Sequence, residues 1–128
     1  MKIEHVAVWT DKLEDLKDFY IRCFNARASE KYINAKKQFE SYFLTFDSGC
    51  RLELMTTPGL INRPAEANRS IGLTHFAISV GSKERVDSMT EEFRRNGVSI
   101  AGEPRTTGDG YYESVILDPD GNKIEITI

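Results

Sequence analysis

Two histidines and two glutamates are the residues of this sequence whose types and spacing best suit chemistry. His5 and His75, the only histidines of the chain, lie 70 residues apart in the matching segments EHVAV and THFAI. Glu53 and Glu125 lie 72 residues apart, each four positions after the glycine of a predicted turn. Two imidazoles and two carboxylates suit a borderline divalent ion such as Ni²⁺, Co²⁺, Zn²⁺, Fe²⁺ or Mn²⁺. The sequence therefore predicts one metal site with four protein ligands.

The segments around these residues alternate between two faces of predicted strands. In residues 3–9 the valines oppose His5, Ala7 and Trp9, and residues 73–80 repeat the pattern around the second histidine. Both glutamates likewise alternate with leucines or isoleucines. Because the apolar face of such a sheet needs a covering helix, all four ligands should lie on the opposite face. A buried carboxylate pair there requires a cation or a shared proton.

Each of the four residues also has a simpler explanation. A strand histidine is often a hydrogen-bonded structural residue, and a strand glutamate often belongs to a solvated face. Internal duplication alone would preserve both pairs. The agreement of residue type, face and repeat position favours the metal site.

The rest of the chain predicts helices and strands in a repeated order. An amphipathic helix of about 14 residues follows the first strand, with the Thr10–Asp11 pair as N-cap, Glu14 as capping-box partner and Asn25 at its end. A second helix begins after Ser82 and ends at Asn96. The other strands are predicted at residues 28–33, 39–46, 51–56, 98–101, 111–117 and 123–128.

The order of one strand, one helix and three strands thus occurs twice. It predicts an α+β fold made of two tandem βαβββ modules. The boundaries expected within a single domain of residues 1–128 are a first module at 1–57, a linker at 58–70 and a second module at 71–128. Two copies are too few for a solenoid, so paired modules are the better interpretation.

Composition argues against several other classes of protein. A chain of 128 residues that is 40% hydrophobic and 29% charged is typical of a globular domain. Its net charge of −3 argues against a general nucleic-acid or anionic-membrane binder. No apolar run is long enough for a membrane span, and the first residues read as a strand instead of a signal peptide. The two cysteines form no CxxC pair, so we expect a cytoplasmic protein without disulfides.

With these motifs identified, the chain resembles members of the vicinal oxygen chelate superfamily, which includes glyoxalase I, bleomycin-resistance proteins and extradiol dioxygenases. The resemblance covers essentially the whole chain and rests on the segments EHVAV, LTHFAI, LEL and DPDGNKIE. It implies a cupped, incomplete barrel that is often completed in a homodimer. In such a dimer, His5 and Glu53 of one subunit would meet His75 and Glu125 of the other.

Within the superfamily, the set of His, Glu, His and Glu ligands is most similar to that of glyoxalase I. The compact chain resembles the short type that prefers Ni²⁺ or Co²⁺, with Zn²⁺, Mn²⁺ and Fe²⁺ as alternatives. This resemblance implies a lyase or isomerase that acts on a hemithioacetal or similar vicinal-oxygen substrate through a metal-stabilised enediolate, with Glu53 or Glu125 as base. Two alternatives stay open. A fosfomycin-type thiol transferase or a dioxygenase would use only His5, His75 and Glu125, and a drug-sequestering protein would need no metal.

Some positions depart from the glutathione-dependent lyases of the family. Those enzymes usually carry arginine four residues after the first ligand and often asparagine four residues after the second, where this chain has Trp9 and Thr57. Both changes disfavour glutathione as the thiol. Trp9 could stack on a flatter or more apolar substrate, although core packing explains it equally well. Arg105, and Arg63 and Arg69 in the linker, could hold an anionic group, although solvated loop arginines are common.

A polar segment late in the chain is the last candidate for substrate contact. Residues 102–110 are predicted to form a loop, and residues 106–112 could form a lid over the site. Tyr111 and Tyr112 follow one another, so only one of them can face the substrate. We take Tyr111 as the candidate.

Overall fold

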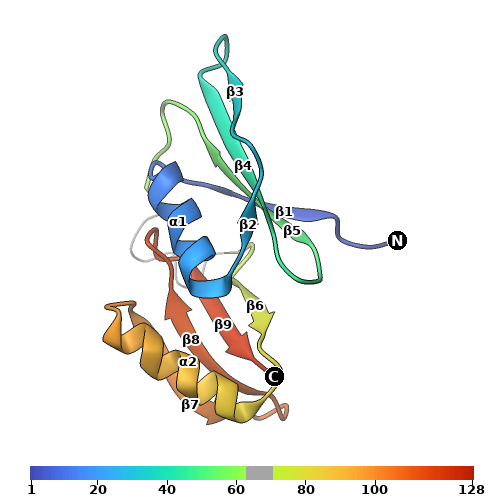
Figure 1. The fold of residues 1–128 in the computed structure, drawn as a ribbon, viewed down its shortest axis with the longest axis vertical. Coiled ribbons are helices and arrows are strands. Elements are labelled where there is room, and N and C mark those ends of the chain that lie inside the picture. The colour runs from blue at the N-terminus through green and yellow to red at the C-terminus, as the bar shows by residue number, and fades with distance from the viewer. Residues whose placement is uncertain (63–70) are drawn as a thin grey trace. The chain divides into compact units, whose positions relative to one another are not determined.

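The computed structural model describes residues 1–62 and 71–128. The chain divides into two compact units, Met1–Arg63 and Pro64–Ile128, and this boundary falls inside the predicted linker. Residues 63–70 of that linker, with Arg63 and Arg69, lie outside the described residues. In the described residues each unit contains one open sheet and one α-helix (Figure 1). The α+β class predicted from the sequence is confirmed.

The first unit is a sheet with one helix on one of its faces. Its elements are β1 (His5–Trp9), α1 (Leu13–Phe24), β2 (Arg27–Ala28), β3 (Tyr32–Asn34), β4 (Phe39–Thr45) and β5 (Arg51–Thr56). The strand order is β1-β5-β4-β2, and β3 also pairs with β4. β1 runs parallel to β5, and the other pairs are antiparallel. β5 is therefore hydrogen-bonded on both sides, whereas β1 is an edge strand.

The second unit repeats this plan. Its elements are β6 (His75–Ser79), α2 (Lys83–Arg95), β7 (Ile100–Thr106), β8 (Tyr112–Leu117) and β9 (Lys123–Thr127). The strand order is β6-β9-β8-β7, with β6 parallel to β9. This is the βαβββ order expected from the sequence, and the histidine strand again lies at the edge beside the glutamate strand.

Each core forms between a helix and the apolar face of its own sheet. In the first unit the buried side chains are those of Leu13, Leu16, Phe19, Tyr20, Leu44, Leu52 and Leu54. In the second they are Val86, Met89, Phe93, Ile116, Ile124 and Ile126, with a buried hydrogen bond of 2.7 Å between the hydroxyls of Thr90 and Ser114. Alternation along the strands therefore directs the other face of each sheet away from its helix. No helix among the described residues has both the length and the apolar composition needed to span a membrane.

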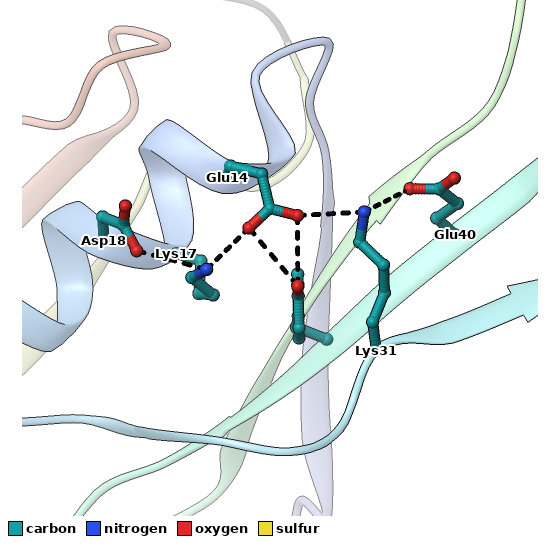
Figure 2. Close-up of polar contacts among 6 residues, drawn as sticks. Glu14, Lys17, Asp18, Lys31 and Glu40 are labelled. Carbon is teal, nitrogen blue, oxygen red and sulfur yellow. Dashed lines mark hydrogen bonds and ion pairs between the residues drawn. The ribbon is translucent and has the colours of Figure 1, made fainter.

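A polar network ties α1 to the strands of the first unit (Figure 2). The Glu14 carboxylate contacts Lys17 Nζ at 2.6 Å and Lys31 Nζ at 2.9 Å, and it accepts a hydrogen bond of 3.1 Å from the Tyr42 hydroxyl. Lys31 also contacts Glu40 on β4 at 2.7 Å. The hydrogen bonds from Lys17 and Lys31 lower the pKa of Glu14 to about 2. The network joins the start of the helix to the middle of the sheet.

The start of α1 differs from the prediction, whereas the end of α1 and the start of α2 agree with it. Lys12, not the Thr10–Asp11 pair, is the N-cap, and no side chain caps the helix. Thr10 instead accepts a hydrogen bond of 2.9 Å from the Lys12 N–H through Oγ1, which shapes the turn before the helix. Asn25 ends α1 in the left-handed conformation, and Ser82 caps α2 by accepting from the Arg85 N–H, both as predicted.

Two other predicted segments, one in each unit, were also wrong in detail. The strand predicted at residues 28–33 is divided into β2 and β3, because the Ser29 side chain accepts from the Phe43 N–H and interrupts the regular ladder. The loop predicted at residues 102–110 is mostly strand, since β7 extends to Thr106 through two irregularities in its pairing with β8. At the first of these, a Cβ on Gly102 would lie only 3.2 Å from the Val115 side chain.

Candidate functional site

The first unit brings one predicted ligand pair together. His5 lies on β1 and Glu53 on the neighbouring β5, where Ala7 is the direct register partner of Glu53. The distance from His5 Nε2 to Glu53 Oε2 is 3.9 Å. The side chains are 40% and 15% exposed, so both are reachable from solvent. They lie on the face opposite to Leu52 and Leu54, which are buried in the core.

The second unit contains the equivalent pair in the same register. His75 lies on β6, Glu125 lies on β9, and Ala77 is the direct partner of the glutamate. His75 Nε2 and Glu125 Oε2 are 3.2 Å apart. Because β5 and β9 are each hydrogen-bonded to strands on both sides, the backbone of both glutamates is fixed on the inner strands of the sheets. The two histidines lie on the more accessible edge strands.

The chemistry and spacing of each pair fit a divalent metal ion. Two ligand atoms about 2.0–2.2 Å from one ion lie about 3–3.5 Å apart at the usual angles. The His75–Glu125 pair, at 3.2 Å, has this spacing, and the His5–Glu53 pair lies slightly beyond it at 3.9 Å. Within the part of the chain that the structure describes, no three His, Cys, Asp or Glu side chains form a group that could hold a metal. Each unit contains two of the four predicted ligands.

Both histidines have a hydrogen-bond partner at the other ring nitrogen. His5 Nδ1 lies 2.5 Å from Glu4 Oε2, and His75 Nδ1 lies 3.3 Å from Thr74 Oγ1. Glu4 also contacts Arg51. Hydrogen bonds from His5 and Arg51 lower the pKa of Glu4 below its usual range. When Nδ1 carries the proton, Nε2 is left with a lone pair directed toward the glutamate of its pair.

A tight turn sets the position of Glu125. The buried Asp118 carboxylate accepts from the backbone N–H groups of Asp120 and Asn122 at 3.0 and 2.8 Å, and from Asn122 Nδ2 at 2.8 Å. Gly121 takes a φ of 79°, which favours glycine. The turn joins β8 to β9 as the DPDGN segment predicted, and it fixes the register in which Glu125 pairs with Val115 on β8.

The second unit also holds a cavity beside its ligand pair, with a volume of about 250 Å³. Arg105 lies in it, 3.5 Å from the Glu113 carboxylate, and Lys123 is a second basic residue there. The lining residues are Thr74, His75, Ala101, Arg105, Glu113, Val115, Lys123 and Glu125. The structure therefore brings the predicted Arg105 next to His75 and Glu125, on strand β7 instead of on a loop.

Trp9 and Tyr111 are both exposed, but their surroundings differ. Trp9 packs edge-on against Phe39 at 6.1 Å, and Phe39 lies 6.1 Å from Tyr32, so the three rings form an aromatic row on the first sheet. Tyr111 is 55% exposed, and its N–H donates to Thr107 Oγ1 in a short turn. Tyr112 donates to Asp87 on α2, so its side chain belongs to the helix side of the sheet.

Three polar residues near the ligand pairs were missed by the sequence prediction: Glu4, Glu113 and Lys123. Glu4 precedes β1, so strand alternation does not govern the direction of its side chain. Glu113 and Lys123 lie on alternating positions of β8 and β9, so the sequence pattern could have placed them on the same sheet face as Glu125. The sequence could not predict that they lie near His75, because this proximity depends on how the strands pair.

Solved structures show the same fold over nearly all of the chain. The structure of SMU.1112c has a TM-score of 0.85 and 19% identity, covering 100% of this chain and 98% of the other. A glyoxalase family protein from Enterococcus faecalis has a TM-score of 0.81 and 22% identity, with 99% and 97% covered. The trypanothione-dependent glyoxalase I of Leishmania major has a TM-score of 0.78 and 22% identity, with 99% and 86% covered. At these identities the likeness establishes the fold.

The family follows from the sequence together with this fold. A search of curated proteins gives no match. The model of the glyoxalase/bleomycin resistance protein/dioxygenase superfamily matches residues 2–126. The match spans both units, including both histidine strands and both glutamate strands. The chain therefore belongs to the glyoxalase/bleomycin resistance protein/dioxygenase superfamily, as its sequence motifs indicated.

Proposed function

We propose that this chain is a divalent-metal-dependent lyase or isomerase of the glyoxalase I type. The observation that carries the proposal is that the His5 side chain lies beside Glu53, and the His75 side chain beside Glu125, in identical strand registers. Two carboxylates at equivalent positions distinguish this set from a three-ligand site. Membership of the superfamily and the fold shared with glyoxalase I proteins support this assignment.

His5, Glu53, His75 and Glu125 are the proposed ligands of one ion, with Ni²⁺ or Co²⁺ favoured over Zn²⁺, Mn²⁺ or Fe²⁺. When bound, the ion polarises the vicinal oxygens of the substrate and acidifies the adjacent C–H. Glu53 or Glu125 takes the proton from one carbon and returns it to the next. Glu125 lines the cavity of its unit, which supports its access to a substrate. Glyoxalase-like folds commonly form dimers, and we propose a homodimer.

The substrate proposed is the hemithioacetal of a 2-oxoaldehyde with a thiol other than glutathione. Trp9 and Thr57 replace the residues that usually hold glutathione in the family. The aromatic row of Trp9, Phe39 and Tyr32 supplies an apolar wall for a flat or apolar thiol, and Tyr111 is a further contact. Thiol use varies on this fold, as the trypanothione-dependent enzyme of Leishmania major indicates.

Metal reloading followed by a hemithioacetal assay tests this function. Metal-free protein is loaded with Ni²⁺, Co²⁺, Zn²⁺ or Mn²⁺ and assayed on methylglyoxal with several thiols. We expect turnover with at least one metal, and a loss of more than about 100-fold in Glu53→Gln and Glu125→Gln because each removes a proton acceptor. The control is Glu30→Gln, which changes an exposed glutamate between β2 and β3. Full turnover in either variant, with the fold intact, would overturn the mechanism.

A further inference from the structure

We propose that Glu4, held in place by Arg51, is a positioning residue that orients the His5 imidazole for metal binding. The Glu4 carboxylate has two oxygens with different partners. Oε2 lies 2.5 Å from His5 Nδ1, and Oε1 accepts from Arg51 Nε at 2.8 Å. A carboxylate accepts only, so the proton of the neutral imidazole belongs on Nδ1. The Nε2 lone pair then faces Glu53.

Arg51 fixes Glu4 at both its main chain and its side chain. The Arg51 N–H donates to the Glu4 carbonyl at 3.0 Å, while Nε and Nη2 both contact Oε1. Glu4 lies just before β1, where backbone pairing alone would not set its side-chain direction. The guanidinium thus determines which way the carboxylate points, and leaves one oxygen free for the histidine.

An aromatic ring completes the support around His5. The Phe43 ring meets the imidazole edge-on, at 5.4 Å between centroids and an interplanar angle of 89°. The Arg51 guanidinium lies 4.1 Å from the centroid of the same Phe43 ring. Arg51 therefore contacts both Glu4 and Phe43, and these three residues restrict the rotation of the imidazole about the Cα–Cβ and Cβ–Cγ bonds of His5.

The second unit lacks this carboxylate, which makes it an internal comparison. At the equivalent positions His75 is preceded by Thr74 and paired in register with Lys123. Its Nδ1 partner is the Thr74 hydroxyl, at the longer distance of 3.3 Å. A carboxylate partner raises the basicity of a coordinating imidazole more than a hydroxyl does. Of the two histidines, His5 is therefore the better donor to a cation.

The first experiment reads the position of the proton on His5 and needs no metal. Long-range ¹H–¹⁵N NMR spectra distinguish the Nδ1–H and Nε2–H tautomers of a neutral imidazole. The chain has only two histidines, and the His75→Gln variant assigns the His5 signals. We expect the Nδ1–H tautomer in the native protein and its loss in Glu4→Ala. An Nε2–H tautomer in the native protein would overturn the inference whatever the enzyme's activity.

The second experiment measures metal affinity and rests on the proposed function. Co²⁺ binding is followed by its visible absorption and by competition with a chelator. Loss of an outer-shell partner typically lowers affinity by about 10–100-fold, so we expect this change in Glu4→Ala and a smaller one in Glu4→Gln, which keeps an acceptor oxygen. Arg51→Met should act in the same direction as Glu4→Ala. The exposed Glu30→Gln is the control, expected to change affinity less than threefold.

The outcomes separate this inference from the proposed function. If Glu53→Gln weakens Co²⁺ binding but Glu4→Ala and Arg51→Met do not, the inference fails and the metal site stands. If the native protein binds no Co²⁺, Ni²⁺ or Zn²⁺, the metal site fails and only the tautomer result bears on Glu4. Thermal melting confirms that each variant is folded, as expected for residues that are 55% and 39% exposed.

Discussion

Arg105 and Lys123 give the cavity of the second unit two positive side chains beside His75 and Glu125. Arg105 contacts Glu113 at 3.5 Å, and its own side chain is 63% exposed. A contact this long leaves most of the guanidinium donors available to a ligand. A carboxylate on the thiol moiety of a substrate is the group that a guanidinium binds best in two-pronged geometry.

Arg105→Gln should therefore raise KM for a hemithioacetal whose thiol carries a carboxylate. A charge-assisted hydrogen bond contributes about 1.5 kcal/mol, which corresponds to a rise of about tenfold. With an uncharged thiol such as 2-mercaptoethanol, KM should not change. Steady-state kinetics on the two substrates measure the difference, and Arg95→Gln on the exposed surface of α2 is the control. An equal rise for both thiols would show that Arg105 does not recognise charge.

At this scale the sequence predicted the strand faces of the four candidate ligands better than it predicted the residues around them. Strand alternation is a local property, so the sequence alone predicted which strand face carries each candidate ligand: His5, Glu53, His75 and Glu125. The sequence could not predict the contacts of Glu4, because they depend on the pairing of His5 with Arg51 between two strands. Arg105 was expected on a loop, and its place in the cavity depends on how β7 pairs with β8.

Helix α1 is joined to its sheet by apolar packing and by the Glu14 network (Figure 2). The side chain of Glu14 is 49% exposed, so solvent screens much of its interaction with the two lysines. Its folded-state pKa of about 2 lies below the ordinary value of 4.5. The ionised carboxylate therefore stabilises the fold above about pH 4.5, and this contribution disappears as the pH falls toward 2.

Glu14→Gln should lower the free energy of unfolding by about 0.5–1 kcal/mol at pH 7, the upper range for an exposed network. The difference from the native protein should shrink between pH 4.5 and pH 2, because the native carboxyl becomes protonated there. Urea unfolding at several pH values measures it. Asp15→Asn is the matched control, since Asp15 is also acidic and in the first turn of α1. A difference that persists at pH 2 would contradict the assignment to charge.

The elements that the sequence predicted correctly are those with a regular period. Both helices, β5, β8 and β9 show strong alternation or helical spacing, and their bounds differ from the prediction by a few residues at most. The irregular elements were the difficult ones. The Ser29 side chain interrupts the pairing with β4 at the point between β2 and β3, and strand β7 contains a glycine and a proline. Neither feature has a local periodicity that a sequence pattern can detect.

The whole chain consists of two units with the same plan, and each carries one histidine–glutamate pair. The proposed four-ligand site needs both pairs, and a symmetric dimer would provide them twice. The sequence predicted the duplication because the 70- and 72-residue offsets are visible in the chain itself. How the pairs combine is a property of assembly, which a repeat pattern does not encode.

Co-expression of two inactive variants tests whether subunits share the site. Glu53→Gln and Glu125→Gln chains form a heterodimer in which one of the two shared sites has all four ligands. We expect the mixture to recover about one quarter of native activity, because half of the dimers in a statistical mixture are heterodimers and each holds one intact site. Each variant expressed alone is the control. No recovery in isolated heterodimers would show that both pairs of a site come from one chain.

Ala7 and Ala77 occupy the positions directly beside Glu53 and Glu125 in the two sheets. Both are exposed, so neither methyl group belongs to a core, and the fold would tolerate many larger side chains there. A bulky replacement would instead fill the space next to the carboxylate, where the proposed ion and substrate would bind. Surveys of thermal stability across variants would therefore classify these two alanines as neutral. A screen for the proposed turnover would instead find substitutions at these two alanines as damaging as substitutions at the proposed ligands.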